Sequence, residues 1–196
     1  MRQMKAFSAN DVADDGYLFF DTETTGLGRE DRLVQLAWIL CAPDGEEISR
    51  NDLLIKPEGF TIPRDATAIH GITTERALAD GVPLTDALEK FQQAIGQSEF
   101  VVGHNIEFDE TFIHGESLRA GLPNRLPLKR RICTMDRSAA YCAIPSSSPY
   151  RKYKWPRLAE LHRKLFDADF DNAHDASADV EATMRCFWEL RKRGVL

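Results

Sequence analysis

The sequence has no long hydrophobic run. A helix that crosses a bilayer needs roughly 20 consecutive apolar residues, and no stretch of this chain approaches that length. The N-terminus is polar and lacks the apolar segment of a signal peptide. We therefore expect a soluble, cytoplasmic protein with no membrane partner.

Closely spaced cysteines are also absent. The four cysteines are Cys41, Cys133, Cys142 and Cys186, and most of them lie among hydrophobic residues. None forms the Cys-x-x-Cys pair that is typical of zinc sites and redox motifs. Because cytosolic proteins rarely form disulfides, we expect reduced core residues rather than disulfide partners or zinc ligands.

The chain has no excess of positive charge. It contains 25 basic and 31 acidic residues, for a net charge of -6. A protein that coats nucleic acid by bulk electrostatics needs many cations to neutralise phosphates, so this class is disfavoured. Local contact with nucleic acid stays open, because basic residues are clustered at positions 129–131 and 151–157.

Neither an internal repeat nor a domain linker is visible. The 196 residues, 43% of them hydrophobic, are enough to bury one full core. Residues 1–14 are polar and aperiodic, so we expect a loosely ordered lead-in, and residues 15–196 are expected to form a single domain. Strand-like runs at 17–22, 33–41 and 48–55 are separated by turn formers, which favours an antiparallel meander.

Helices and a further strand follow the meander. Thr73 is placed to cap a short helix, and Pro156 suits the first turn of a helix that carries three leucines. Hydrophobic periodicity predicts further helices over residues 84–96, 106–120, 134–143 and 176–193, and a strand over 99–103. This order predicts an α/β fold with a mixed central sheet flanked by helices.

Two carboxylates one residue apart follow the first hydrophobic run, in the segment FDTETTG. Alternate side chains of a strand share a face, so Asp21 and Glu23 would point the same way. Like charges placed in this way repel each other unless a cation lies between them. The pair alone also fits a solvated strand end without an ion, so a metal site depends on further ligands.

Two aspartates lie in the apolar stripes of expected helices. Asp109 precedes Phe112 and Ile113 by three and four residues, and Asp179 precedes Ala182 by three. One buried aspartate is usually a hydrogen-bonded structural residue. Four carboxylates directed at one interior, however, would repel strongly without cations. Hard oxygen ligands indicate magnesium or manganese rather than zinc.

His174 lies five residues before Asp179, with Asp175 between them as a helix cap. An imidazole on the loop before a helix is mobile, and histidine titrates near neutral pH, which suits a general base. A structural role is the alternative for any single histidine. The register with Asp179 is what distinguishes His174 from the other four histidines.

Three segments resemble the exonuclease motifs of the DEDDh family of 3′→5′ exonucleases. They are FDTETTG at 20–26, VGHNIEFD at 102–109 and HDASAD at 174–179, in the family's order and at similar separations. The family includes the proofreading epsilon subunit of bacterial DNA polymerase III, RNase T and oligoribonuclease. The resemblance covers about residues 16–190 and implies a ribonuclease H-like fold.

The resemblance also implies the chemistry of the site. Asp21, Glu23, Asp109 and Asp179 would hold two divalent cations, Mg²⁺ or Mn²⁺, and His174 would be the general base. A two-metal mechanism would cleave the last phosphodiester bond and release nucleoside 5′-monophosphates from a 3′ end. It needs no covalent intermediate, which agrees with the absence of a serine or cysteine nucleophile motif.

Contacts with the terminal nucleotide are assigned by resemblance. Thr24 and Leu27, just after the first two carboxylates, would touch this nucleotide. His70, in the segment AIHGIT, would border it from a loop or would make a turn hydrogen bond instead. His104 and Asn105 of the second motif are expected to be structural, as strand end and helix cap.

The segment YRKYKW, residues 150–155, alternates cations with aromatic side chains. This is typical of single-strand binding surfaces, and Tyr153 and Trp155 are its candidate substrate contacts. A solvated basic loop, with Trp155 packed as an anchor for the next helix, fits the segment equally well.

The threonine-rich first motif looks like that of the epsilon subunit, which favours single-stranded or frayed DNA ends as substrate. An RNA 3′-end trimming enzyme of the RNase T type is the alternative, because 2′-hydroxyl recognition depends on pocket contacts. A catalytically silent nucleic-acid-binding module should lack a carboxylate or the histidine, and none is missing. The chain ends at Leu196 without the extension by which the epsilon subunit joins its polymerase, so polymerase association stays open.

Overall fold

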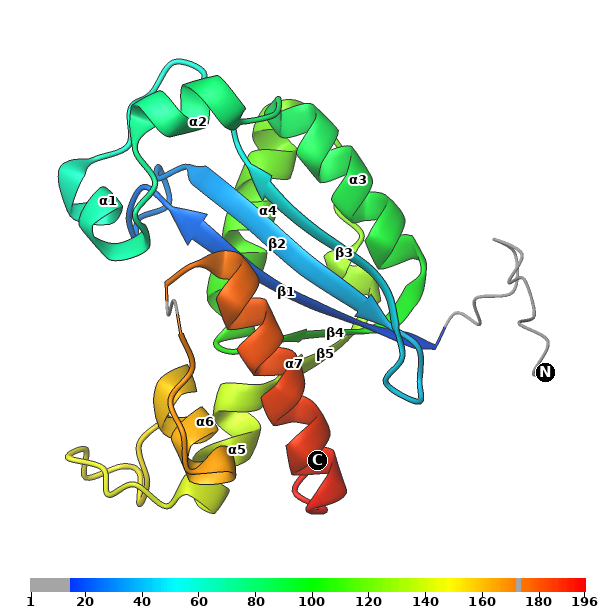
Figure 1. Cartoon of the computed structure of the whole chain (residues 1–196), viewed down its shortest axis with the longest axis vertical. Coiled ribbons are helices and arrows are strands. Elements are labelled where there is room, and N and C mark those ends of the chain that lie inside the picture. Colours follow the sequence, from blue (N-terminus) through cyan, green and yellow to red (C-terminus); the bar gives the residue numbers. More distant parts are fainter. Residues whose placement is uncertain (1–14, 172–173) are drawn as a thin grey trace.

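A mixed five-stranded sheet forms the centre of the computed structural model, which describes residues 15–171 and 174–196 (Figure 1). The lead-in expected at residues 1–14 lies outside these residues. The strands are β1 (Gly16–Thr24), β2 (Leu33–Cys41), β3 (Glu47–Leu54), β4 (Ser98–Gly103) and β5 (Arg130–Cys133). Their order in space is β3-β2-β1-β4-β5. The first three are antiparallel, as predicted, and β4 and β5 run parallel to β1.

Helices cover both faces of the sheet, in the ribonuclease H-like arrangement that the sequence predicts (Figure 1). They are α1 (Arg64–His70), α2 (Thr74–Asp80), α3 (Leu84–Gly96), α4 (Ile106–Ala120), α5 (Thr134–Cys142), α6 (Leu158–Phe166) and α7 (Ala176–Lys192), with a single 3₁₀ turn at Leu126–Leu128. In the part of the chain that the structure describes, no helix combines the length and the apolar character needed to cross a membrane. All four cysteines are free; Cys41, Cys142 and Cys186 are buried, as predicted for core residues, and Cys133 is half-buried.

Alternate residues of β1 belong to two separate hydrophobic cores. Leu18 and Phe20 pack on one face of the sheet with residues of α3 and α4. Tyr17 and Phe19 pack on the other face, where Phe187 of α7 contacts both rings. Side chains further along β1 continue this alternation. The carboxylate pair at the end of the strand therefore lies on the α7 face.

Two local predictions were wrong. The expected loop at AIHGIT begins inside α1, which Gly71 ends with a φ of 74°. This helix has seven residues and buries only Ala66 and His70, so it shows no apolar stripe. Pro156 lies before α6 rather than in its first turn. Arg157 is the N-cap, and its backbone N–H donates to Glu160 Oε2 (2.8 Å).

The predicted caps of two other helices are confirmed. The Thr73 hydroxyl accepts a hydrogen bond from the backbone N–H of Arg76 (3.2 Å) at the start of α2. Asp175 caps α7 and accepts from the backbone N–H groups of Ser177 (3.1 Å) and Ala178 (3.2 Å). Both caps satisfy backbone donors that a helix start leaves free.

A buried ion pair joins α4 to the start of β2. The fully buried carboxylate of Glu116 accepts hydrogen bonds from Arg32 Nε (2.8 Å) and from the backbone N–H of Leu33 (3.0 Å). Arg32 is in turn bound to the end of β1, because its backbone N–H donates to Thr25 Oγ1 (2.9 Å) and its carbonyl accepts from the N–H of Thr25 (2.9 Å). One carboxylate thus fixes the loop after β1 to α4.

Replacing Glu116 with glutamine is expected to lower the free energy of unfolding by about 3 kcal/mol, because breaking a buried pair leaves a charge without compensation. We take the low end of the usual range, since the Arg32 side chain keeps 24% exposure. The matched control, Glu181→Gln, removes the exposed pair with Arg50 (2.8 Å) and should cost less than about 1 kcal/mol. Urea unfolding measures both values, and equal losses would contradict the role given to Glu116.

Candidate active site

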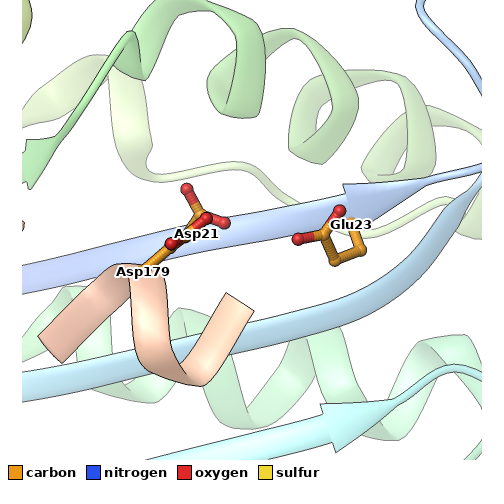
Figure 2. A group of neighbouring side chains, drawn as sticks. All are labelled: Asp21, Glu23 and Asp179. Atoms are coloured by element: carbon orange, nitrogen blue, oxygen red, sulfur yellow. The ribbon is translucent and has the colours of Figure 1, made fainter. Parts of the chain in front are cut away.

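Three carboxylates meet on the α7 face of β1. Asp21 and Glu23 come from the end of the strand, and Asp179 comes from the first turn of α7 (Figure 2). One oxygen from each lies within 4.8 Å of the other two. Strand alternation and the start of α7 thus combine residues that are far apart in the sequence.

Asp109 approaches β1 from the opposite face. It is buried on α4, and its Oδ1 accepts a hydrogen bond from Thr22 Oγ1 (2.7 Å). Thr22 points toward α4 because it lies between Asp21 and Glu23 on the strand. The structure therefore brings oxygens of three of the four predicted carboxylates within 4.8 Å of one another. The fourth, Asp109, lies beside Thr22, close enough for its charge to add to the effect of burial in raising the pKa of both carboxylates on β1.

Burial and mutual repulsion disturb the titration of this cluster. Burial raises the pKa of Asp21 well above its ordinary value, and the charges of Asp109 and Asp179 add to the effect. The pKa of Glu23 is raised to about 8, mainly by burial and then by Asp179. Burial also raises the pKa of Asp179, to about 6, against a lowering by a backbone hydrogen bond. Burial raises the pKa of Asp109 to about 7, although the hydrogen bond from Thr22 lowers it.

The donor set fits divalent cations. None of the ion pairs found among the described residues involves Asp21, Glu23 or Asp179. Oδ1 of Asp179 is buried and has no hydrogen-bond partner within the same residues. A buried carboxylate oxygen beside two other carboxylates needs a proton or a cation as partner. Oxygen-only ligands suit magnesium or manganese.

His174 lies beside the cluster, directly before α7. It is exposed and has a φ of 70°, a left-handed conformation that is uncommon for residues other than glycine. Its backbone N–H donates to Asp179 Oδ2 (3.3 Å). The two residues that the sequence places five positions apart are therefore in direct contact in the structure.

The loop after β1 and the end of α1 carry the residues expected near the terminal nucleotide. Thr24 is buried and its hydroxyl donates to the carbonyl of Gly26 (2.7 Å), whereas Leu27 is 87% exposed. His70 is buried, and its Nδ1 accepts a hydrogen bond from the N–H of Ile72 (3.1 Å). This is the turn hydrogen bond that the sequence left as an alternative. Nε2 of His70 is buried, and among the described residues it makes no hydrogen bond of full geometry. The backbone of Thr24 is nevertheless near enough to raise the pKa of the imidazole against the larger lowering by burial.

His104 and Asn105 of the second motif occupy structural positions, as expected. His104 Nε2 donates to the carbonyl of Pro156 (2.9 Å), and Nδ1 lies 3.0 Å from Thr134 Oγ1. Burial lowers the pKa of this imidazole to about 4. Asn105 is the N-cap residue of α4 with a φ of 72°, although its side chain makes no capping hydrogen bond. His104 thus links the start of α4 to the segment before α6.

Tyr153 and Trp155 lie on the segment between α5 and α6. Tyr153 is half-buried and forms an isolated antiparallel bridge with Pro145. Trp155 is 46% exposed, so it does not act as the buried helix anchor that the sequence allowed. The guanidinium of Arg151 lies 3.6 Å from the centroid of its ring.

Sequence reasoning missed Thr22 and Glu116. Thr22 lies between the two strand carboxylates, and alternation alone places it on the opposite face. Glu116 follows Asp109 by seven residues, or about two helical turns, which places both on the same face of α4. Both residues could therefore have been found from their spacing to the predicted carboxylates.

Comparison with known proteins gives a consistent result. The sequence model of the exonuclease family matches residues 18–187. An uncharacterized exonuclease of Escherichia phage 186, CP81, is 29% identical over 188 residues, which cover 92% of this chain and 91% of the phage protein. The PolC-type DNA polymerase III of Streptococcus suis is 31% identical over 190 residues, which cover 95% of this chain but only 12% of the polymerase.

Solved structures show the same fold. Escherichia coli exonuclease I in complex with a dA16 oligonucleotide has a TM-score of 0.73 at 23% identity, covering 91% of this chain and 41% of that one. The zinc-bound complex of E. coli exonuclease I with single-stranded DNA has a TM-score of 0.77 at 24% identity, covering 92% and 41%. This chain therefore spans about two fifths of the exonuclease I chains.

Metal-free protein is expected to lose stability as pH rises. Raised pKa values mean that the folded cluster holds more protons than the unfolded chain, so the free energy of unfolding falls as those protons leave. The fall should run from about pH 4, where unfolded carboxyls titrate, to about pH 8, the pKa of Glu23. Urea unfolding in EDTA at several pH values measures it. Glu23→Gln should flatten the curve, and a rise in stability across this interval would refute the assignment.

Divalent cations are expected to replace the protons at the cluster. At pH 7, adding Mn²⁺ to EDTA-treated protein should raise the thermal midpoint and release protons into a weakly buffered solution. Asp179→Asn should reduce both effects, because it removes the charge beside the unpartnered oxygen. An equal rise of the thermal midpoint in this variant would show that the ion binds elsewhere.

Proposed function

The chain belongs to the exonuclease family, and we propose that it is a metal-dependent 3′→5′ exonuclease acting on single-stranded or frayed DNA. The observation that carries this proposal is the group formed by Asp21, Glu23 and Asp179, whose oxygens lie within 4.8 Å of one another. A buried group of like charges is stabilised by bound cations or by protons. Cations held there would face the charge that develops on phosphate oxygens during hydrolysis.

The proposed ligands are Asp21, Glu23, Asp109 and Asp179. Two divalent cations, Mg²⁺ or Mn²⁺, would neutralise these carboxylates when bound and would stabilise charge on the attacking and leaving oxygens. Among the described residues, the hydrogen bonds to these carboxylates include those that Thr22 Oγ1 donates to Asp109 (2.7 Å) and that the N–H of His174 donates to Asp179 (3.3 Å). The bond from Thr22 orients Asp109.

His174 is the proposed general base. It is exposed, and the contact of its backbone with Asp179 (3.3 Å) keeps it beside the cluster. The imidazole would accept a proton as the water oxygen bonds to phosphorus and the bond to the 3′ oxygen breaks. The products are a nucleoside 5′-monophosphate and a strand shortened by one nucleotide with a free 3′ hydroxyl.

The terminal nucleotide is proposed to lie against the loop after β1 and the end of α1. Thr24 ends β1 and Leu27 lies in the loop that follows. Leu27 is 87% exposed, so an apolar side chain is available to a nucleobase. His70 offers Nε2 as a hydrogen-bond donor beside the backbone of Thr24, because Nδ1 already accepts.

DNA is the preferred substrate in this proposal. The exonuclease I structures that share the fold contain single-stranded DNA, and a PolC-type DNA polymerase III contains a similar segment. An RNA 3′-end trimming activity of the RNase T type is the alternative. Association of this chain with a polymerase is supported here by its similarity to the segment of the PolC-type DNA polymerase III.

Digestion of matched 5′-labelled single-stranded DNA and RNA oligonucleotides with Mg²⁺ tests the proposal. Wild-type protein should give a ladder of single-nucleotide steps, faster on DNA. EDTA and Asp21→Asn should abolish the ladder, and His174→Ala should slow it by about 10²–10⁴-fold. His114→Ala, at an exposed position on α4, is the matched histidine control and should retain full activity.

Faster digestion of RNA would assign the alternative substrate. A ladder that survives EDTA would refute the metal-dependent mechanism, and an equal loss in His174→Ala and His114→Ala would refute the proposed base. No digestion of either polymer by metal-loaded wild-type protein would indicate a catalytically silent module.

A further inference from the structure

Residues 144–155, between α5 and α6, form a small projection that we call the basic finger. Its two sides are joined by the bridge between Pro145 and Tyr153, by a hydrogen bond from the N–H of Lys154 to the carbonyl of Ile144 (2.9 Å), and by one from Ser146 to Lys152 (3.3 Å). Figure 1 shows this segment, in yellow, extending away from α5 and α6. The finger is therefore an organised hairpin-like element with its tip in solvent.

Two cation–aromatic pairs lie on the finger. The guanidinium of Arg151 is 3.6 Å from the ring centroid of Trp155, and Nζ of Lys152 is 5.1 Å from that of Tyr153. Tyr150 is 93% exposed and Trp155 is 46% exposed. Rings with so much exposed surface contribute little to the core. Aromatic rings and an arginine plane that face solvent are instead suited to stacking with nucleobases.

The charges at the tip are also available. Among the ion pairs of the described residues, Lys154 pairs with Glu160 (2.6 Å), but no pair includes Arg151 or Lys152. The chain as a whole has a net charge of -6. Two unpaired cations beside exposed rings thus form a local positive surface on an acidic protein, which is suited to contact phosphates.

The base of the finger is attached to the candidate active site. Pro156 follows Trp155 directly, and its carbonyl accepts the hydrogen bond from His104 Nε2 (2.9 Å). His104 lies two residues before the start of α4, and Asp109 lies in the first turn of this helix. The same helix end therefore carries a proposed metal ligand and anchors the finger.

We propose that the basic finger holds single-stranded nucleic acid on the 5′ side of the bond that is cleaved. Bases would stack on Tyr150 and on the Arg151–Trp155 pair, and Lys152 would contact phosphates. This inference rests on the proposed exonuclease function and adds a second contact region to it. Every base has a face that can stack, so the finger would bind without sequence preference and would favour long substrates over short ones.

The test compares kcat/KM for a thymidylate dinucleotide and for a long oligothymidylate, both with Mg²⁺. Wild-type protein should prefer the long substrate, mainly through a lower KM. Arg151→Ala should reduce this preference about tenfold, since one stacking contact contributes roughly that much. Arg151→Lys keeps the charge but lacks the guanidinium plane, so it should recover only part of the preference. Lys90→Ala, on the exposed surface of α3, removes one positive charge elsewhere and is the matched control.

A second measurement separates this inference from the proposed function. Anisotropy of a labelled oligothymidylate in EDTA reports binding without cleavage, and Arg151→Ala should weaken it about tenfold relative to Lys90→Ala. Equal binding and equal length preference in the two variants would overturn the finger as a strand-binding element. Loss of digestion in wild-type protein, with binding that still depends on Arg151, would overturn the exonuclease function alone.

Discussion

Repulsion among buried carboxylates at the end of β1 is the constraint on which the rest of the structure depends. Asp21 and Glu23 share one face of a strand that lies between β2 and β4, with hydrophobic cores on both sides. The strand cannot shift to separate the charges without breaking sheet hydrogen bonds and exposing both cores. Burial, and after it the repulsion, therefore raise the pKa values of Asp21 and Glu23 in the folded protein, and cations or protons must relieve the strain.

The position of α4 relative to this strand is fixed at two points on one helix face. Asp109 accepts a hydrogen bond from Thr22 (2.7 Å), and Glu116 accepts one from Arg32 (2.8 Å). Both carboxylates are buried, so each contact is strong only when its geometry is well satisfied. The ion pair of Glu116 with Arg32, which stabilises the fold, thus also fixes where α4 lies along β1. It thereby fixes the position of Asp109, a proposed metal ligand.

Sequence patterns predicted the elements better than the contacts between them. The predicted 106–120 helix is α4 itself, with Ile106, Phe112 and Ile113 buried, and the predicted 17–22 strand lies within β1. The partners of Asp109 and Glu116 are 87 and 84 residues away, and no local pattern specifies such pairs. The sequence also predicted four carboxylates in one interior, and the other three lie close enough to Asp21 for their charges to raise its pKa, after the larger effect of burial. α1 was missed because a two-turn helix with two buried residues has no visible period.

An acidic protein that binds a polyanion must attract it locally. A net charge of -6 repels a nucleic acid strand at long range, so bulk electrostatics would oppose the proposed substrate. Cations at the carboxylate cluster would cancel its negative charge where the bond is cleaved. The basic finger would add positive charge where the strand approaches. It would also offer stacking, which salt weakens less than it weakens phosphate contacts. On this proposal, attraction of the strand is local, and the acidic remainder of the surface would favour release of the shortened strand.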